Sequence, residues 1–413
     1  MRKIFLVPVL LFFSIAASAQ KKKAVFVIVD GIPADLIEKL PTPGLDSIAG
    51  KKGYKRAFVG GERGGYSQTP TISAVGYNSV LTGTWVNKHN VWGNYGKDIA
   101  APNYNYKTIF RLLKDNYPSK TAGIFSSWLD NRTKLVGEKL SGTGNLILDY
   151  KYDSLEYDTI SYPKDTTSLR MHHIDEAVIN KAAQVIREDA PDLSWVYLEY
   201  TDDMGHTFGD GPQFFASIKT MDNQMGRLWQ AIKYRKKKFN EDWLIMITTD
   251  HGRDSATGMH HGGQSDRERS GWIVTNAIDL NNHFTEDSIS IVDIMPTISK
   301  HLNLKMSKDH TREIDGTSLI GKVGATDLTA RMHNGRLQLT WKNKMKKGRG
   351  KVWVTSTNNF KTGKEDKYKL LGEVQLDQEQ AAFNLEEGTD GFYKIVLETP
   401  HNTINRWITD KRK

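Results

Sequence analysis

The 413-residue sequence contains no cysteine. Disulfide bonds, thiolate metal ligands and a cysteine nucleophile are therefore excluded. After residue 13 there is no apolar run long enough to span a membrane, so we expect no transmembrane segment once the N-terminus is removed. No nucleic-acid-binding motif accompanies the formal net charge of +9, and we expect no nucleic-acid partner. The basic runs of the sequence are typical of solvated surface. A mild attraction to anionic substrates or anionic membrane surfaces is the alternative interpretation.

The first 19 residues have the pattern of a secretory signal peptide. Arg2 and Lys3 precede an apolar stretch at residues 4–13, and Ala17-Ser18-Ala19 provides small residues for cleavage before Gln20. An uncleaved anchor is the alternative interpretation. We expect an exported protein, periplasmic or secreted, and a large cysteine-free chain is compatible with a bacterial enzyme of that kind.

Residues 20–323 alternate apolar strands with amphipathic helices. A continuous β-branched and apolar run is typical of a buried parallel strand, and we expect such strands at residues 24–29, 195–198, 244–248 and 272–274. Apolar residues at helical spacing predict one helix around residues 178–186 and another over 214–232. This alternation predicts a mostly parallel sheet with helices on both faces, in which functional sites form beyond the carboxyl ends of the strands.

Two other regions differ in character. Residues 96–170 are irregular and are expected to pass over the site, with a helix at 106–116 and a strand at 121–125. From about residue 324 the chain has short alternating segments separated by turn residues, which predicts a C-terminal β-sandwich domain at 324–413. Its expected strands lie at 337–341, 352–356, 368–376, 381–385 and 392–397.

Acidic and imidazole side chains follow the expected strands of the first domain. These residues are Asp30, Asp202, His206, Asp250, His251 and His261. Carboxylate and imidazole are ligands that a pair of catalytic divalent metals would use, and a mixed set of this kind suits Zn²⁺ better than Mg²⁺ or Ca²⁺. We therefore expect two divalent ions, with zinc as the assignment and Mn²⁺ or Fe²⁺ as alternatives.

A hydroxyl nucleophile is expected in the segment that begins at Thr69. Ser73 at the first turn of a helix would gain the positive end of the helix dipole and nearby backbone N–H donors. Its alternative role is that of an ordinary helix N-cap. Thr71 is the rival nucleophile, and His260 is the rival of His261 as a ligand.

These motifs together resemble the alkaline phosphatase superfamily, and within it the nucleotide pyrophosphatase/phosphodiesterase branch. The resemblance extends over about residues 23–320. Its motifs are Asp30-Gly31, Ser73 ahead of Thr82-Gly83, His89-Asn90-Val91 with Asn94, Asp202 with His206, Asp250-His251-Gly252 and His261-Gly262-Gly263. The chain departs from the branch in having Ser73 where threonine is usual and Asn90 where glycine is usual. The sulfatase pattern, in which Cys or Ser is followed by Pro and Arg, is absent from the sequence.

The resemblance implies an alkaline-phosphatase-like α/β/α sandwich and assigns roles to individual residues. One metal would be held by Asp202, His206 and His261, and the other by Asp30, Ser73, Asp250 and His251. Asn94 and the backbone N–H of Ala74 would bind a non-bridging phosphoryl oxygen, and Ser73 would form a covalent phospho-enzyme.

The substrate implied is a small phosphate ester or a nucleotide. Aromatic residues that could form a wall for the second ester group are Trp85, Trp92, Tyr95 and Trp128, of which we prefer Trp128. Arg132 and Lys134 are candidate cations for a monoester dianion. We expect a phosphodiesterase or nucleotide pyrophosphatase, with an alkaline phosphomonoesterase as the alternative. A phosphotransferase or a non-catalytic surface-binding protein is the second alternative.

Overall fold

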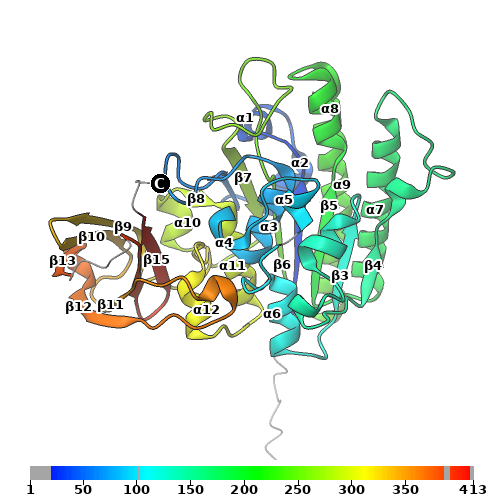
Figure 1. Cartoon of the computed structure of the whole chain (residues 1–413). Helices are drawn as coiled ribbons and strands as arrows, with labels where there is room; N and C mark the ends of the chain where they lie inside the picture. Colours follow the sequence, from blue (N-terminus) through cyan, green and yellow to red (C-terminus); the bar gives the residue numbers. More distant parts are fainter. Residues whose placement is uncertain (1–19, 101, 386–390, 410–413) are drawn as a thin grey trace, which may run out of the picture.

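The computed structural model describes residues 20–100, 102–385 and 391–409. The expected signal peptide lies outside these residues. Within them, no helix combines the length and the apolarity needed to cross a membrane. The described chain forms a large α/β unit followed by a smaller β unit (Figure 1).

An eight-stranded sheet forms the centre of the α/β unit, in the order β4-β3-β5-β1-β6-β7-β2-β8. Its strands are β1 (Lys22–Val29), β2 (Tyr54–Phe58), β3 (Ala122–Ser126), β4 (Tyr150–Tyr152), β5 (Leu193–Leu198), β6 (Asp242–Thr248), β7 (Ser270–Thr275) and β8 (Ile289–Ser290). Neighbours pair in parallel except where β7 meets β6 and β2, so β7 alone among these strands runs in the opposite direction. The expectation of a mostly parallel sheet is confirmed.

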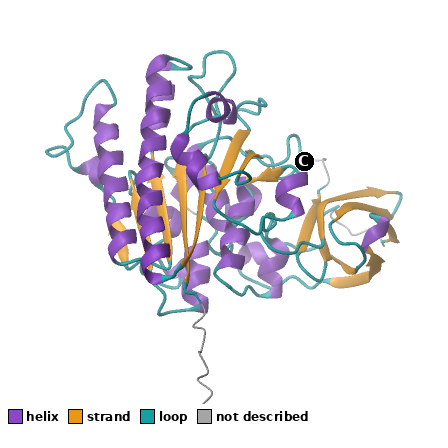
Figure 2. Cartoon of the chain, turned by 180° about the vertical axis from the view of Figure 1, so that it is seen from behind, coloured by secondary structure: helices purple, strands orange, loops and turns teal. Residues whose placement is uncertain are grey.

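Helices cover both faces of the sheet, which makes three layers (Figure 2). Successive residues of β1 point to opposite faces, with Ala24, Phe26 and Ile28 in one core and Val25 and Val27 in the other. The first core is completed mainly by α3 (Ser73–Thr82), α6 (Ile109–Asn116) and α11 (Ile294–His301). The second is completed by α1 (Ala34–Lys39), α2 (Pro43–Ala49), α7 (Leu169–Glu188) and α9 (Pro212–Phe239).

Shorter helices lie in the connections. They are α4 (Val86–His89), α5 (Lys97–Ala100), α8 (Tyr200–Phe208), α10 (Asn282–Glu286) and α12 (Lys308–Glu313). The helix expected from residue 106 begins later, at Ile109, because the Thr108 side chain caps it by accepting a hydrogen bond from the Arg111 backbone N–H. The strand expected at 121–125 is β3, which is displaced by one residue.

The C-terminal β unit consists of two packed antiparallel sheets. Its strands are β9 (Ala325–His333), β10 (Arg336–Asn343), β11 (Arg349–Thr355), β12 (Lys369–Gln375), β13 (Gln380–Asn384), β14 (Tyr393–Glu398) and β15 (Thr403–Ile408). One sheet has the order β13-β10-β9 and the other β12-β11-β14-β15, and apolar side chains from both form one core. The five expected strands are present, while β9 and β15 were not anticipated from the sequence.

Two buried lysines make contacts that join the two units. Lys88 of α4 is fully buried and donates to Asp315 Oδ1 at 2.6 Å and to Asn405 Oδ1 of β15 at 3.0 Å. Lys394 of β14 is 1% exposed and donates to Glu313 Oε1 at 2.6 Å. Asp315 therefore balances the charge of Lys88 within the α/β unit, and Asn405 bonds to it across the boundary. Glu313 balances the charge of Lys394 across the same boundary.

Candidate active site

Four parallel strands deliver the candidate residues to one edge of the sheet. Asp30 follows β1, Asp202 lies in α8 just after β5, and Asp250 follows β6. These strands are neighbours in the order β5-β1-β6, so their carboxyl ends lie side by side. The neighbouring β3 ends at Ser126 and leads to Trp128.

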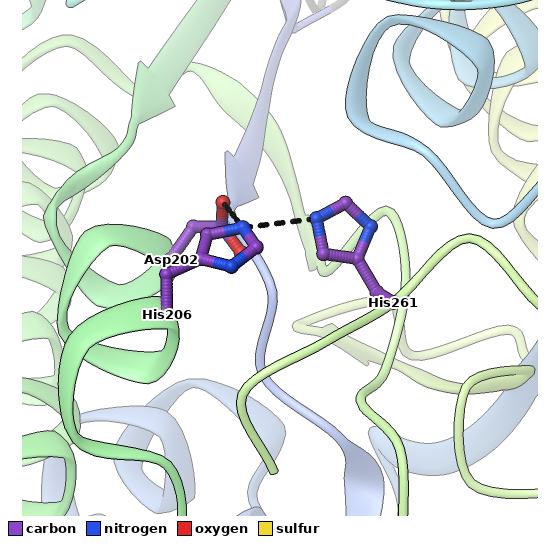
Figure 3. Close-up of side chains that lie close together, drawn as sticks. All are labelled: Asp202, His206 and His261. Atoms are coloured by element: carbon purple, nitrogen blue, oxygen red, sulfur yellow. Dashed lines mark hydrogen bonds and ion pairs between the residues drawn. The ribbon is translucent and has the colours of Figure 1, made fainter.

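One group of possible metal ligands consists of Asp202, His206 and His261 (Figure 3). Asp202 and His206 are one helical turn apart in α8, and His206 Nε2 lies 3.1 Å both from Asp202 Oδ2 and from His261 Nε2. The Nδ1 atoms of the two histidines lie 2.8 Å from backbone carbonyls, those of Met259 and Thr71 respectively. With Nδ1–H donating, both Nε2 atoms carry lone pairs that face each other, and a cation between them removes this repulsion.

The second group consists of Asp30, Asp250 and His251, all buried. His251 Nε2 lies 3.2 Å from Asp30 Oδ1 and 3.2 Å from Asp250 Oδ2, while its Nδ1 lies 2.9 Å from the Gly252 carbonyl. Among the described residues, neither of these two carboxylate oxygens has a hydrogen-bond partner. Buried oxygens without donors are costly, so this group also fits a cation.

In each of the three carboxylates, protein donors bind one oxygen and the other faces the ligand group. Arg253 Nη2 donates to Asp202 Oδ1, the Gly31 N–H donates to Asp250 Oδ1 at 3.2 Å, and two tyrosine hydroxyls contact Asp30 Oδ2. Arg253 is fully buried. It was not predicted from the sequence, because nothing next to His251-Gly252 indicates whether the following arginine is buried or lies at the surface.

Burial and neighbouring charges shift the pKa values of several of these ligand residues. Burial lowers the pKa of His251, but the charges of Asp250 and Asp30 outweigh it and raise that pKa to about 9. Burial and the neighbouring His251 lower the pKa of His261 to about 4. Burial disfavours the charge on Asp202, yet the His206 hydrogen bond and Arg253 hold its pKa well below the usual range.

The candidate nucleophile borders both groups. Ser73 is the first residue of α3, with a 6% exposed side chain whose Oγ lies 3.4 Å from His251 Nε2. The His251 and His261 rings stack with their centroids 3.7 Å apart, which places the two groups in contact. The seven residues expected to hold metals therefore surround one small space.

The Ala74 N–H and the Asn94 side chain, both expected to bind a phosphoryl oxygen, contact each other in the structure. The Ala74 N–H donates to Asn94 Oδ1 at 2.8 Å, so these two groups contact each other and the Ala74 N–H is not free for a phosphoryl oxygen. Asn94 itself lines the cavity beside Ser73. Its Oδ1 accepts from the first turn of α3, where unpaired N–H groups attract an acceptor.

The two rivals lie elsewhere. Thr71 Oγ1 donates to the Gly263 carbonyl at 2.9 Å and accepts from the Gly262 N–H, so it supports the loop that carries His261. His260 is exposed, and its backbone N–H donates to Asp254. Neither belongs to the two groups of possible metal ligands.

A cavity of about 180 Å³ opens over Ser73. Its lining includes Asp30, Ser73, Tyr77, Asn94, Tyr95, Trp128, Tyr197, Glu199, Asp202, Asp203, His206 and His261. Of the four aromatic candidates, Trp128 and Tyr95 line this cavity, whereas Trp85 and Trp92 are not part of its lining. Among the described residues, no lysine or arginine lines the cavity.

The expected cations are committed to other partners. Arg132 pairs with Asp153 and Glu138 at 2.6 Å each, and Lys134 pairs with Asp130 at 2.7 Å. Conversely, Glu199 and Asp203 add two carboxylates to the cavity wall that sequence reasoning did not single out. Burial and neighbouring carboxylates raise the pKa of Asp203 to about 6 and that of Glu199 well above its usual value.

Two solved structures with TM-scores above 0.5 support the architecture, and a third is reported for comparison. A putative sulfatase from Bacteroides thetaiotaomicron is 10% identical, with a TM-score of 0.53 over 88% of this chain and 85% of that chain. The protein Ps i-CgsB, in complex with k-i-k-neocarrahexaose, is 14% identical, with a TM-score of 0.51 over 78% of this chain and 82% of that chain. Human ectonucleotide pyrophosphatase/phosphodiesterase 5 is 15% identical, with a TM-score of 0.49 over 69% of this chain and 96% of that chain.

A family match covers more than half of the chain. The family described as type I phosphodiesterase/nucleotide pyrophosphatase matches residues 24–267, a span that contains both ligand groups and Ser73. Its superfamily is the one that the sequence motifs resemble. The chain therefore belongs to the type I phosphodiesterase/nucleotide pyrophosphatase family of the alkaline phosphatase superfamily.

Proposed function

We propose that this protein is a metal-dependent phosphodiesterase that uses Ser73 as its nucleophile at a two-metal site. The observation that carries the proposal is the position of Ser73 Oγ, 3.4 Å from His251 Nε2 and on the wall of the cavity shared by the two ligand groups. Family membership supports the coarser statement that the substrate is a phosphate ester.

The ligands favour zinc for both positions, since imidazole and carboxylate together suit Zn²⁺ better than an all-oxygen metal. Asp202, His206 and His261 would hold one ion. Asp30, Asp250, His251 and Ser73 would hold the other. Bound ions would lower the pKa of the Ser73 hydroxyl and offset the charge that develops on the phosphoryl oxygens.

The remaining chemistry belongs to the chain itself. Ser73 Oγ would bond to phosphorus as the bond to the leaving oxygen breaks, and the hydroxyl proton would end on the departing alcohol. Asn94 lines the cavity, and its side-chain NH₂ group would donate a hydrogen bond to a non-bridging phosphoryl oxygen. Water would then cleave the phospho-Ser73 bond, which regenerates the hydroxyl and releases a monoester.

The charge of the cavity wall supports a diester over the alternatives. A monoester dianion or a nucleoside triphosphate brings more negative charge, and the described lining offers no lysine or arginine to balance it. A singly charged diester places its second substituent against Trp128 and Tyr95. An alkaline phosphomonoesterase is the second candidate, because the ligand groups alone do not distinguish the two.

Three substrates test the proposal: a nitrophenyl diester, a nitrophenyl monoester and a nucleoside triphosphate, each assayed with purified zinc-loaded protein. We expect the diester to be hydrolysed with the highest kcat/KM, activity to disappear after chelation and to return with zinc. A clear monoester preference would contradict the diester assignment. Full activity after complete removal of metal would contradict the two-metal assignment.

The location and domain division are also proposals. The signal pattern at residues 1–19 supports export to the periplasm or the medium, which fractionation of producing cells would test. We propose residues 20–323 as the catalytic domain and 324–413 as the C-terminal domain, on the basis of the separate core formed by β9–β15.

A further inference from the structure

We propose that Tyr77 and Tyr197 act together as positioning residues that fix Asp30 so that a single carboxylate oxygen faces the metal position. This inference rests on the proposed function, because it requires that Asp30 binds a metal ion. It concerns residues to which neither the motifs nor the family resemblance gives a role.

The three side chains form a closed set of contacts. Tyr197 OH lies 2.7 Å from Asp30 Oδ2 and 2.7 Å from Tyr77 OH, and Tyr77 OH also contacts Asp30 Oδ2. All three are at most 2% exposed, which limits competition from water for these contacts. Both hydroxyls converge on Oδ2, and Oδ1 is left without a hydrogen-bond partner among the described residues, 3.2 Å from His251 Nε2.

This arrangement differs from that of the other two carboxylates. Asp202 is held by the Arg253 guanidinium, whose charge offsets that of the carboxylate, and Asp250 Oδ1 accepts from the Gly31 backbone N–H at 3.2 Å and from Thr249 Oγ1 at the longer distance of 3.5 Å. Asp30 is held by two neutral phenols, which restrict its rotation and leave its full negative charge available to a cation. The orientation of Asp30 therefore depends on two short contacts with uncharged side chains, which substitution can remove without changing the charge of the site.

The tyrosines also link separate elements. Tyr77 lies one helical turn after Ser73 in α3, and Tyr197 lies near the end of β5. Their contacts with Asp30 tie the helix that carries the candidate nucleophile to β1 and β5. The Asp30 carboxylate is in this way connected to the helix that begins with Ser73.

A purely structural role makes a different prediction from a positioning role. If the phenols only satisfy a buried carboxylate, their loss lowers the stability of the metal-free protein and leaves the metal affinity unchanged. If they orient Asp30, their loss weakens metal binding at one of the two positions, because the freed carboxylate rotates away from the orientation that the metal requires.

The test measures zinc affinity rather than hydrolysis. Tyr77→Phe, Tyr197→Phe and the wild type are titrated with zinc in competition with a chelating indicator, and the thermal stability of each metal-free protein is recorded. Tyr106→Phe is the matched control, since Tyr106 is 1% exposed and its hydroxyl has no hydrogen-bond partner among the described residues.

We expect the wild type to bind two zinc ions, and each variant of the pair to bind one of them about 10- to 100-fold more weakly. The other ion and the control variant should be unaffected. Unchanged affinity for both ions in folded Tyr77→Phe and Tyr197→Phe would overturn this inference and leave the proposed function intact. A wild type that binds no zinc would overturn both.

Discussion

Replacement of Arg253 by methionine should destabilise the protein strongly, although this side chain is not part of the cavity lining. The guanidinium is fully buried and donates to Asp202 Oδ1, and also to the carbonyls of Asp202 at 2.7 Å and Gly31 at 2.9 Å. Methionine fills much of the volume but leaves these acceptors, including a buried carboxylate, without donors. Removing one partner of a buried ion pair costs about 3–5 kcal/mol.

Thermal unfolding of the metal-free protein provides the assay. At about 2 °C per kcal/mol for a large domain, the Tm of Arg253→Met should fall by about 6–10 °C. Arg63→Met is the matched control, because Arg63 pairs with Asp266 at 2.6 Å while both side chains are more than half exposed. Such a pair contributes about 1 kcal/mol or less, so the control should shift the Tm by about 2 °C at most. Equal Tm shifts for the two variants would refute the reasoning.

Further outcomes follow from the same geometry. Ser73→Ala should abolish turnover of the nitrophenyl diester while both zinc ions remain bound by elemental analysis, and Ser217→Ala, a buried serine of α9, should retain activity. Trp128→Ala should raise KM for the aromatic diester about 10-fold or more without changing the zinc content, because the second substituent of the diester loses the indole ring against which it is proposed to pack. Burial opposes the charge on His283, but Asp293 and Asp287 raise its pKa to about 9, above the ordinary 6.5. The resulting stabilisation is complete below about pH 6.5 and is lost as the pH rises through 9, so urea midpoints should fall over that range in the wild type and fall less in His283→Gln.

Much of the site could be predicted from the sequence because its ligands follow strongly apolar runs. Residues 24–29 and 244–248 are continuous buried strands, and their ends fix the positions of Asp30 and Asp250. The spacing of Asp202 and His206 likewise places both on one face of a helix, as the structure shows.

The remaining parts depend on contacts between residues that are distant in the chain. Tyr77 and Tyr197 are separated by 120 positions, and each has the pattern of an ordinary core aromatic. The contact between Ala74 and Asn94 was not anticipated either, since it depends on how the loop after α4 returns to α3. The strands β9 and β15 were missed because only three of the nine residues of β9 and two of the six of β15 are buried, so their apolar alternation is weak.

The buried lysines between the two units have a practical meaning for how the chain can be divided. Lys88 follows the candidate nucleophile helix closely, and its ammonium group reaches Asn405 near the end of the chain. A shortened chain ending at residue 323 would lose that partner and open the environment of Asp315 and Glu313 to solvent. The two units are therefore tied by buried charges, and exchanging the C-terminal unit for the β unit of another protein would leave Lys88 without Asn405 and Glu313 without Lys394.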